Sequence, residues 1–132
     1  ALERDLRRET GRASRYGRRF SVMLLDLDGL KTANDRHGHA AGDALLRSLS
    51  QALGRALRVG DAAYRIGGDE FVVLLPETSD ETVDTVVGRI VRAGAPPFGW
   101  GTAVYPDDAT DGDGLICAAD QRMLAARAAA RS

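Results

Sequence analysis

Acidic residues stand at two places in the chain where apolar segments meet a turn. Asp26 and Asp28 follow the apolar run Val22–Leu25, and Asp69 stands in the sequence Gly67-Gly68-Asp69-Glu70-Phe71. Asp26 and Asp28 leave the same side of an extended backbone, because side chains alternate along a strand. Carboxylates packed this closely repel each other and resist burial, and a bound divalent cation would relieve both costs. The alternative interpretation is that the two aspartates only end a strand.

The Gly67-Gly68 pair predicts a hairpin turn. It separates the apolar runs Ala62–Ile66 and Phe71–Leu75, and glycines take positive φ without a Cβ penalty. Hairpin turns are also rich in Gly and Asp for conformational reasons alone. If the strand before Asp26 lies beside this hairpin, Asp26 and Asp69 meet at one edge of the sheet. Two carboxylates without paired Cys or His ligands favour Mg²⁺ over zinc, and Mg²⁺ held in this way usually also takes phosphate oxygens.

The histidine and cysteine residues do not form a pattern that predicts a zinc site. His37 and His39 have no third ligand at a sensible spacing, so we interpret them as turn histidines. The single cysteine, Cys117, excludes an internal disulfide, and its place in the apolar run Leu115–Ala119 predicts a buried side chain.

Hydrophobic periodicity predicts the elements that position these residues. Lys31–His39 looks like a short polar connection, and Asp43 like a cap or dipole partner in the first turn of the next helix. The order of elements predicts an α/β protein of the α+β type, with a mixed or antiparallel sheet flanked by helices, since tight hairpins cannot join parallel strands. We expect helices at Leu2–Tyr16, Ala44–Leu57 and Leu115–Ala130, and strands at Phe20–Leu27, Ala62–Ile66, Phe71–Leu75 and Phe98–Val104. The pattern Thr78-x-x-Glu81 predicts a capping box that opens a further helix, whose apolar stripe is Val83, Val86, Val87 and Ile90.

Bulk composition narrows the class of protein. The 132 residues suit one domain, and 44% hydrophobic with 28% charged residues is ordinary for a globular protein. A net charge of −1 gives no general reason to expect nucleic acid or an anionic membrane as a partner. No apolar stretch approaches the roughly 20 residues needed to insert into a bilayer, and no signal peptide is visible. We therefore expect a cytoplasmic domain.

Two separate blocks of the sequence resemble the GGDEF domain of diguanylate cyclases. One is Arg65-Ile66-Gly67-Gly68-Asp69-Glu70-Phe71. The other runs from Asp26 to Asp43, DLDGLKTANDRHGHAAGD, and is similar to the family pattern D-x-D-x-F-K-x-x-N-D-x-x-G-H-x-x-G-D. The blocks stand in the expected order and at the expected separation, and the resemblance covers essentially the whole chain. It implies a ferredoxin-like palm like that of nucleotidyl cyclases.

The resemblance also implies a domain organisation. Residues 1–132 would form a single GGDEF domain, the truncated C-terminal catalytic part of a larger signalling protein, because the family's usual opening L-T-G-L-x-N-R is absent. The sensor domain would lie outside this chain, and the full-length protein could be tethered to a membrane.

The family condenses two GTP molecules into cyclic di-GMP, with one GTP on each of two domains, so the resemblance implies GTP, cyclic di-GMP and a second GGDEF domain as partners. Asp26, the backbone carbonyl of Leu27, and Asp69 would bind Mg²⁺, with Mn²⁺ as an alternative. Asp69 would also act at the attacking 3′-hydroxyl, with Glu70 supporting the metal site and Lys31 at the triphosphate.

Further residues are implied for substrate binding. Asn34 and Asp43 would hydrogen-bond guanine, with His39 nearby. Arg127 stands where the family has a phosphate-binding lysine, and Arg131 is retained. Because an arginine differs from a lysine in reach and geometry, turnover could fall.

A third block concerns regulation. Arg58-Val59-Gly60-Asp61 resembles the family's R-x-x-D inhibitory site, and Arg89 falls where a second inhibitory arginine occurs. Arginine forks suit phosphate and guanine, so bound product could hold two domains in an unproductive pose. The alternative is that Arg58 and Asp61 form an exposed ion pair at a helix end.

Two departures keep other functions open. The segment Gly94–Val104 is shorter than usual, so an edge hairpin is expected to be missing, and the closing helix differs from the family pattern. The leading hypothesis is an active, product-inhibited cyclase. The alternatives are a catalytically weak or inactive module that binds cyclic di-GMP or GTP, and an interaction domain without nucleotide.

Overall fold

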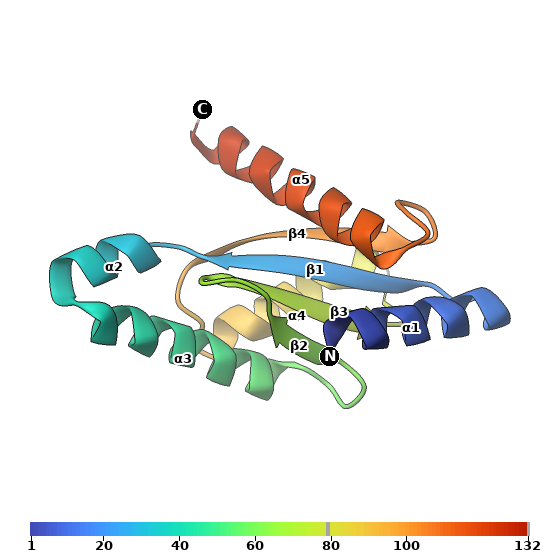
Figure 1. Cartoon of the computed structure of the whole chain (residues 1–132), viewed down its shortest axis with the longest axis horizontal. Helices are drawn as coiled ribbons and strands as arrows, with labels where there is room; N and C mark the ends of the chain where they lie inside the picture. Colours follow the sequence, from blue (N-terminus) through green and yellow to red (C-terminus); the bar gives the residue numbers. More distant parts are fainter. Residues whose placement is uncertain (79, 132) are drawn as a thin grey trace.

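The computed structural model describes residues 1–78 and 80–131, and for residues 80 and 81 the backbone alone. The Glu81 side chain, and with it the predicted capping box, therefore lies outside the described residues. In that part of the chain, five helices and four strands follow one another (Figure 1). Their bounds are α1 (Leu2–Tyr16), β1 (Phe20–Leu27), α2 (Leu30–His37), α3 (His39–Ala56), β2 (Ala62–Arg65), β3 (Glu70–Pro76), α4 (Asp80–Arg92), β4 (Phe98–Tyr105) and α5 (Gly112–Arg131).

The four strands form one antiparallel sheet in the order β2-β3-β1-β4. The sequence β1, α3, β2, β3, α4, β4 is the βαββαβ order of ferredoxin-like folds, with α2 added before α3. The predicted α+β class with an antiparallel sheet is therefore confirmed. The predicted hairpin is also confirmed, because β2 pairs with β3.

The positive φ angles that we expected at the glycines of the hairpin turn are not found. Neither Gly67 nor Gly68 has positive φ, in contrast to glycines elsewhere in the chain. The turn is closed by the Ile66 N–H, which donates to the Glu70 carbonyl at 3.0 Å. The Arg65 guanidinium also donates to the carbonyls of Gly67 at 3.1 Å and Gly68 at 2.7 Å. Side-chain hydrogen bonds thus hold this loop in shape.

Alternation along β1 creates two apolar layers. Met23, Leu25 and Leu27 face the layer covered by α3 and α4. Phe20, Val22 and Leu24 face the layer covered by α1 and α5. Asp26 continues the second alternation, so its side chain emerges on the α5 side of the sheet.

The backbone of α5 packs directly on β4 at Gly101. A Cβ at this position would overlap the Ala119 carbonyl oxygen and would lie 2.5 Å from the Met123 nitrogen. A glycine inside a strand commonly marks such a close approach. Gly101 therefore fixes how closely α5, with its arginines, lies against the sheet.

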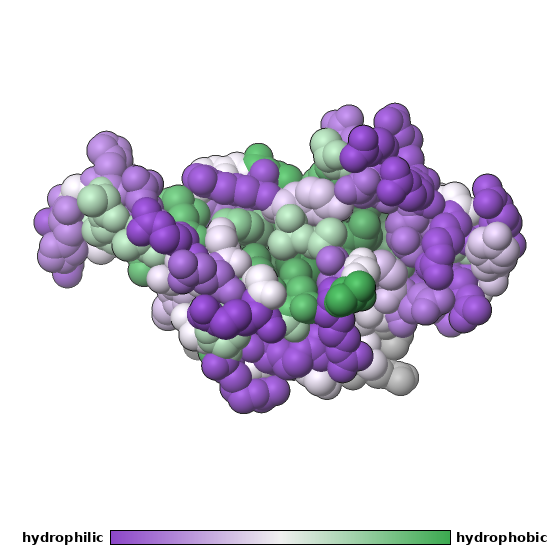
Figure 2. Space-filling view, turned by 90° about the horizontal axis from the view of Figure 1, so that it is seen from below, coloured by the Kyte–Doolittle hydropathy of each residue, from purple (hydrophilic) through white to green (hydrophobic). Residues whose placement is uncertain are grey.

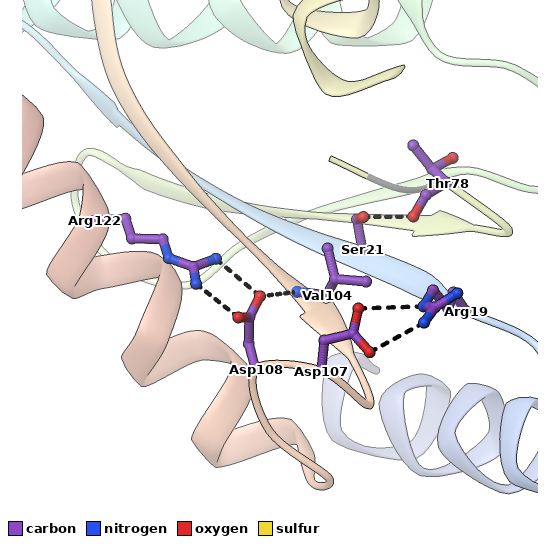
Figure 3. Close-up of polar contacts among 7 residues, drawn as sticks. All are labelled: Arg19, Ser21, Thr78, Val104, Asp107, Asp108 and Arg122. Atoms are coloured by element: carbon purple, nitrogen blue, oxygen red, sulfur yellow. Dashed lines mark hydrogen bonds and ion pairs between the residues drawn. The ribbon is translucent and has the colours of Figure 1, made fainter. Parts of the chain in front are cut away.

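Strand β4 forms one edge of the sheet, as expected from the short Gly94–Val104 segment. Polar side chains cover this edge around Val104 (Figure 3). The Asp108 carboxylate accepts from the Val104 N–H at 2.7 Å and pairs with both Nη atoms of Arg122 at 2.6 and 2.8 Å. Arg122 also donates to the Thr102 carbonyl at 2.7 Å. These contacts satisfy edge groups that would otherwise be open to another strand.

Three local predictions are wrong. The segment Lys31–His39 forms α2 and the start of α3 rather than a polar connection. Because α3 begins at His39, Asp43 lies beyond its first turn and does not cap it. Cys117 is exposed, because the buried positions of α5 are Leu115, Ala119 and Met123 on its opposite face. Among the described helices, none combines the length and apolarity that crossing a membrane requires.

Candidate active site

The candidate site lies at the end of β1, where the β2–β3 turn comes alongside. Asp26 is the cross-strand partner of Glu70, the first residue of β3. One residue earlier, the Asp69 carbonyl accepts the Leu27 N–H at 2.9 Å. The predicted meeting of Asp26 and Asp69 at one sheet edge is therefore what the strand register produces.

The electrostatics of Asp26 are unusual for a carboxylate. Burial raises its pKa from 3.8 to about 6, helped by the side chain and charge of Asp69 and by the charge of Glu70, while Arg127 acts in the opposite direction. Asp26 Oδ1 is buried and has no hydrogen-bond partner among the described residues. An unshared carboxylate oxygen next to a second carboxylate suits a divalent cation.

The donor set fits Mg²⁺ better than zinc. The described residues contain no group of three or more His, Cys, Asp or Glu side chains arranged to hold a metal. Two carboxylates with a nearby carbonyl form an incomplete shell, which Mg²⁺ usually completes with water and phosphate oxygens. Asp26, Leu27 and Asp69 therefore remain compatible with a metal bound together with a nucleotide. Lys31 is exposed on the first turn of α2, which follows the Asp28-Gly29 turn.

Arg127 of α5 reaches across to this site. Its Nη2 donates to the Asp26 carbonyl at 3.0 Å and to Asp28 Oδ1 at 2.5 Å, and its Nη1 lies 3.6 Å from Asp26 Oδ2. Asp26 and Asp28 therefore face the same guanidinium, as their spacing of two predicted. Arg131 lies one turn further along α5 and donates from Nε to the Arg127 carbonyl at 3.3 Å.

A groove runs from this site along β4 and α5. Its volume is about 730 Å³, and both Arg127 and Arg131 line it, with Asp28 at the site itself. Phe98 and Trp100 form an apolar part of its wall. The two arginines predicted to bind substrate thus line one groove that begins at Asp28.

The predicted guanine-binding residues lie where α2 meets α3. The Asn34 side chain packs against Gly42, where a Cβ would overlap Asn34 Oδ1 and lie 2.7 Å from Cγ. Asn34 Oδ1 is buried and has no hydrogen-bond partner among the described residues, so its capacity to accept a hydrogen bond is unused. Asp43, next to Gly42, and His39 are both exposed. The structure therefore places all three predicted residues on one helix pair.

The predicted inhibitory residues also converge. Arg58, Asp61 and Arg89 line one hollow of about 380 Å³, together with Glu77. The Asp61 carboxylate accepts the backbone N–H of Arg58 at 2.9 Å, and no ion pair joins their side chains within the described residues. The Arg89 Nε donates to the Ala56 carbonyl at 3.1 Å. The alternative of a simple ion pair between Arg58 and Asp61 is thus not what the structure contains.

A second hollow lies on the other side of the Arg58–Asp61 turn. Its volume is about 550 Å³, and it lies between α3 and β2 with Leu53, Leu57 and Phe71 in its wall. Figure 2 shows this side of the molecule from below, with apolar surface in the middle and hydrophilic side chains around it. Val59, at the tip of the turn, is fully exposed. The Arg58–Asp61 turn therefore borders both a polar and an apolar hollow.

Gly99 is a site residue that the sequence reasoning missed. It is the β4 partner of Asp26, and a Cβ here would overlap Arg127 Nε and lie 2.6 Å from its Nη2. An isolated glycine in a strand is a known signal for close approach, and it could have pointed to this residue.

Comparison with known proteins gives these residues a family context. A family model described as diguanylate cyclase, GGDEF domain, matches residues 1–132. The bifunctional diguanylate cyclase/cyclic di-GMP phosphodiesterase MucR of Pseudomonas aeruginosa is 32% identical over 137 residues, covering 96% of this chain and 20% of MucR. The diguanylate cyclase DosC of Escherichia coli K12 is 44% identical over 80 residues, covering 60% of this chain and 17% of DosC. The chain thus spans no more than a fifth of either relative.

Solved structures agree with this match. A sensory box/GGDEF family protein from Caulobacter crescentus superposes with a TM-score of 0.88 at 31% identity, covering 97% of this chain and 90% of that one. The GGDEF domain of DgcB from the same species, solved in complex with c-di-GMP, gives a TM-score of 0.87 at 26% identity and covers 98% and 84%.

Proposed function

The chain belongs to the GGDEF family of diguanylate cyclases, and we propose that it condenses two GTP molecules into cyclic di-GMP with release of two pyrophosphates. The observation that carries this proposal is the closeness of Asp26 and Asp69 at the end of β1, where Asp26 Oδ1 is buried without a hydrogen-bond partner among the described residues.

The acidic residues would prepare the nucleophile. A Mg²⁺ or Mn²⁺ ion bound by Asp26, the Leu27 carbonyl and Asp69 would neutralise phosphate charge and lower the pKa of a nearby hydroxyl. In each condensation the 3′-oxygen of one GTP forms a bond to the α-phosphorus of the other, and the bond from that phosphorus to the pyrophosphate oxygen breaks. Asp69 would take the hydroxyl proton, and Glu70 would hold the acidic site in place.

The basic residues would bind the leaving group. Lys31 at the start of α2 and the two α5 arginines, Arg127 and Arg131, would offset the charge of the triphosphate. Such transfers depend on alignment and charge neutralisation more than on covalent chemistry. Asn34 and Asp43 would select guanine, because an amide oxygen and a carboxylate accept from its N1–H and amino groups, with His39 at the rim.

Catalysis of this kind requires a second copy of the domain. The proposed residues form one nucleotide site, whereas the product contains two nucleotides. Two copies would therefore meet with their acidic sites facing each other, at least transiently.

Product inhibition would use the hollow lined by Arg58, Asp61 and Arg89. This hollow lies near the end of β3, whereas Asp69 precedes its start, so the seven residues of β3 separate the two by roughly 20 Å. A ligand there would not block the metal site directly. It would act by holding two domains in an orientation that keeps their GTP molecules apart.

A second candidate function is a module that binds cyclic di-GMP or GTP without turnover. The observation that favours it is Arg127, which occupies the side of Asp26 and Asp28 that faces α5. Such a module would keep the product hollow and lose the reaction.

Product analysis separates the two candidates. The protein is incubated with GTP and Mg²⁺ at high protein concentration, and cyclic di-GMP and pyrophosphate are quantified. The enzyme proposal expects both products from the wild type and neither from Asp69→Ala. Binding of cyclic di-GMP without any product would instead favour the receptor.

A further inference from the structure

Arg127 makes three contacts with the acidic site at once. It reaches the Asp26 carbonyl, the Asp26 carboxylate and the Asp28 carboxylate from a helix that packs on the sheet. The Arg127 side chain is 30% exposed and that of Asp26 21% exposed, so solvent only partly screens the pair. The guanidinium is therefore a cation of the protein itself, seated on carboxylates that the proposed function assigns to a metal.

The planar fork of arginine is what allows this arrangement. Nη2 is shared between a carbonyl and one carboxylate, while Nη1 faces the other carboxylate. A lysine ammonium is a single point charge and cannot extend two separate arms in this way.

Gly99 provides the space for the guanidinium. It lies directly opposite Asp26 on β4, and paired residues of an antiparallel sheet point their side chains to the same face. Any side chain at Gly99 would put its Cβ into Arg127, 2.8 Å from Cζ and closer still to Nε. Its φ is not positive, so a backbone conformation does not account for the glycine.

We propose that Gly99 and Arg127 form a matched pair that holds an internal cation on Asp26 and Asp28 in the nucleotide-free protein, and that the charge of this guanidinium opposes binding of a divalent cation to the free Oδ1 of Asp26. Gly99 is a positioning residue, because it acts through Arg127. Arg127 competes with the metal while no nucleotide is bound, and it binds the triphosphate once GTP is present. The proposal rests on the proposed function, because it takes Asp26 as a metal ligand.

A competition of this kind has a defined consequence. Removing Arg127, or pushing it aside, leaves the carboxylates of Asp26 and Asp28 without their cation, while Asp69 stays close to Asp26. Their mutual repulsion then favours metal binding more strongly than in the wild type. The metal alone should therefore bind more tightly when the pair is broken, the reverse of the loss expected if Arg127 were a purely structural support.

The test measures Mn²⁺ binding to nucleotide-free protein by calorimetry, with free Mn²⁺ followed by electron paramagnetic resonance. We expect R127Q and G99A each to tighten Mn²⁺ binding about fivefold, the size of a partly exposed ion pair. R47Q removes the same charge from the exposed face of α3, and G54A adds a methyl group at a glycine with open space around it. Both controls should stay within about twofold of the wild type.

The outcomes are distinct. Mn²⁺ affinity in R127Q and G99A that equals or falls below the wild-type value overturns the proposal, as does absence of Mn²⁺ binding in all of these proteins. Circular dichroism establishes that each variant is folded. If D26N abolishes Mn²⁺ binding while R127Q leaves it unchanged, only the competition fails. If D26N leaves Mn²⁺ binding intact, the proposed metal site fails with it.

Discussion

Asp26 and Glu70 are direct partners in the pairing of β1 with β3, so the register of two strands brings Asp69 to the end of β1. The same register produces an electrostatic conflict. Burial and the nearby carboxylates disfavour the charge on Asp26, although a metal site would need that charge. The protein therefore gives up some stability at this position, and the loss should be measurable.

Replacing Asp26 by Asn should stabilise the metal-free protein at high pH. The folded-state pKa of about 6 lies above the ordinary 3.8, so Asp26 favours folding below about pH 4 and this contribution is lost as pH rises through 6. Urea unfolding with EDTA should therefore find Asp26→Asn more stable than the wild type at pH 8, with the difference nearly gone at pH 4. An equal difference at both pH values would contradict the assignment.

Gly101→Ala should destabilise the fold by about 1–3 kcal/mol, because the added methyl group meets the α5 backbone rather than a movable side chain. Chemical denaturation measures the change. Gly11→Ala, in open space on α1, is the control and should be neutral or stabilising by up to about 1 kcal/mol. Equal effects of the two substitutions would show that α5 does not pack on β4 as described.

Substitutions of Asp108 and its neighbour Asp107 test whether Asp108 and Arg122 stabilise the β4 edge. Asp108→Asn should cost about 1 kcal/mol at pH 7, because Asp108 holds both Arg122 and the Val104 N–H. Asp107→Asn affects only a more exposed pair with Arg19 (Figure 3) and should cost less than about 0.5 kcal/mol.

The same comparison depends on pH. The Arg122 hydrogen bond, followed by that of Val104, lowers the Asp108 pKa below 3.8, so its contribution is complete above about pH 4 and is lost as pH falls through the lowered pKa. The gap between wild type and Asp108→Asn in urea unfolding should close at strongly acidic pH. A gap that persists there would exclude the charged contact as its cause.

Arg58→Ala should weaken cyclic di-GMP binding by at least about tenfold, because a charged fork to phosphate or guanine contributes about 1.5–3 kcal/mol. Titration calorimetry with cyclic di-GMP measures the change. Arg47→Ala removes an equal charge from the exposed face of α3 and is the control. Unchanged affinity in Arg58→Ala would remove the proposed inhibitory site.

Sequence patterns predicted the sheet and most helices because buried strands and apolar stripes are local signals. They missed α2 because it has no buried residue, so no hydrophobic period marks it. Cys117 was misplaced for a related reason. Its apolar neighbours suggested burial, but the period of α5 turns Cys117 away from Leu115 and Ala119.

Some contacts of the candidate site could also be predicted from local sequence patterns, and others could not. We could predict that Asp26 and Asp69 lie close together, because Asp26 ends a strand and Asp69 lies in the hairpin turn. The contact of Arg127 with Asp26 joins residues far apart in the chain and depends on how closely α5 lies on β4. Gly101 sets that distance, and Gly99 leaves room for the Arg127 side chain. Both roles are visible only once the helix is in place.

The most direct test of the central claim is the initial rate of cyclic di-GMP formation from GTP and Mg²⁺ for the wild type and Asp69→Asn at equal, high protein concentration. We expect product from the wild type and a loss of at least about a hundredfold in Asp69→Asn, with Asp107→Asn unchanged. No product from the wild type, or equal rates for the wild type and Asp69→Asn, would contradict it.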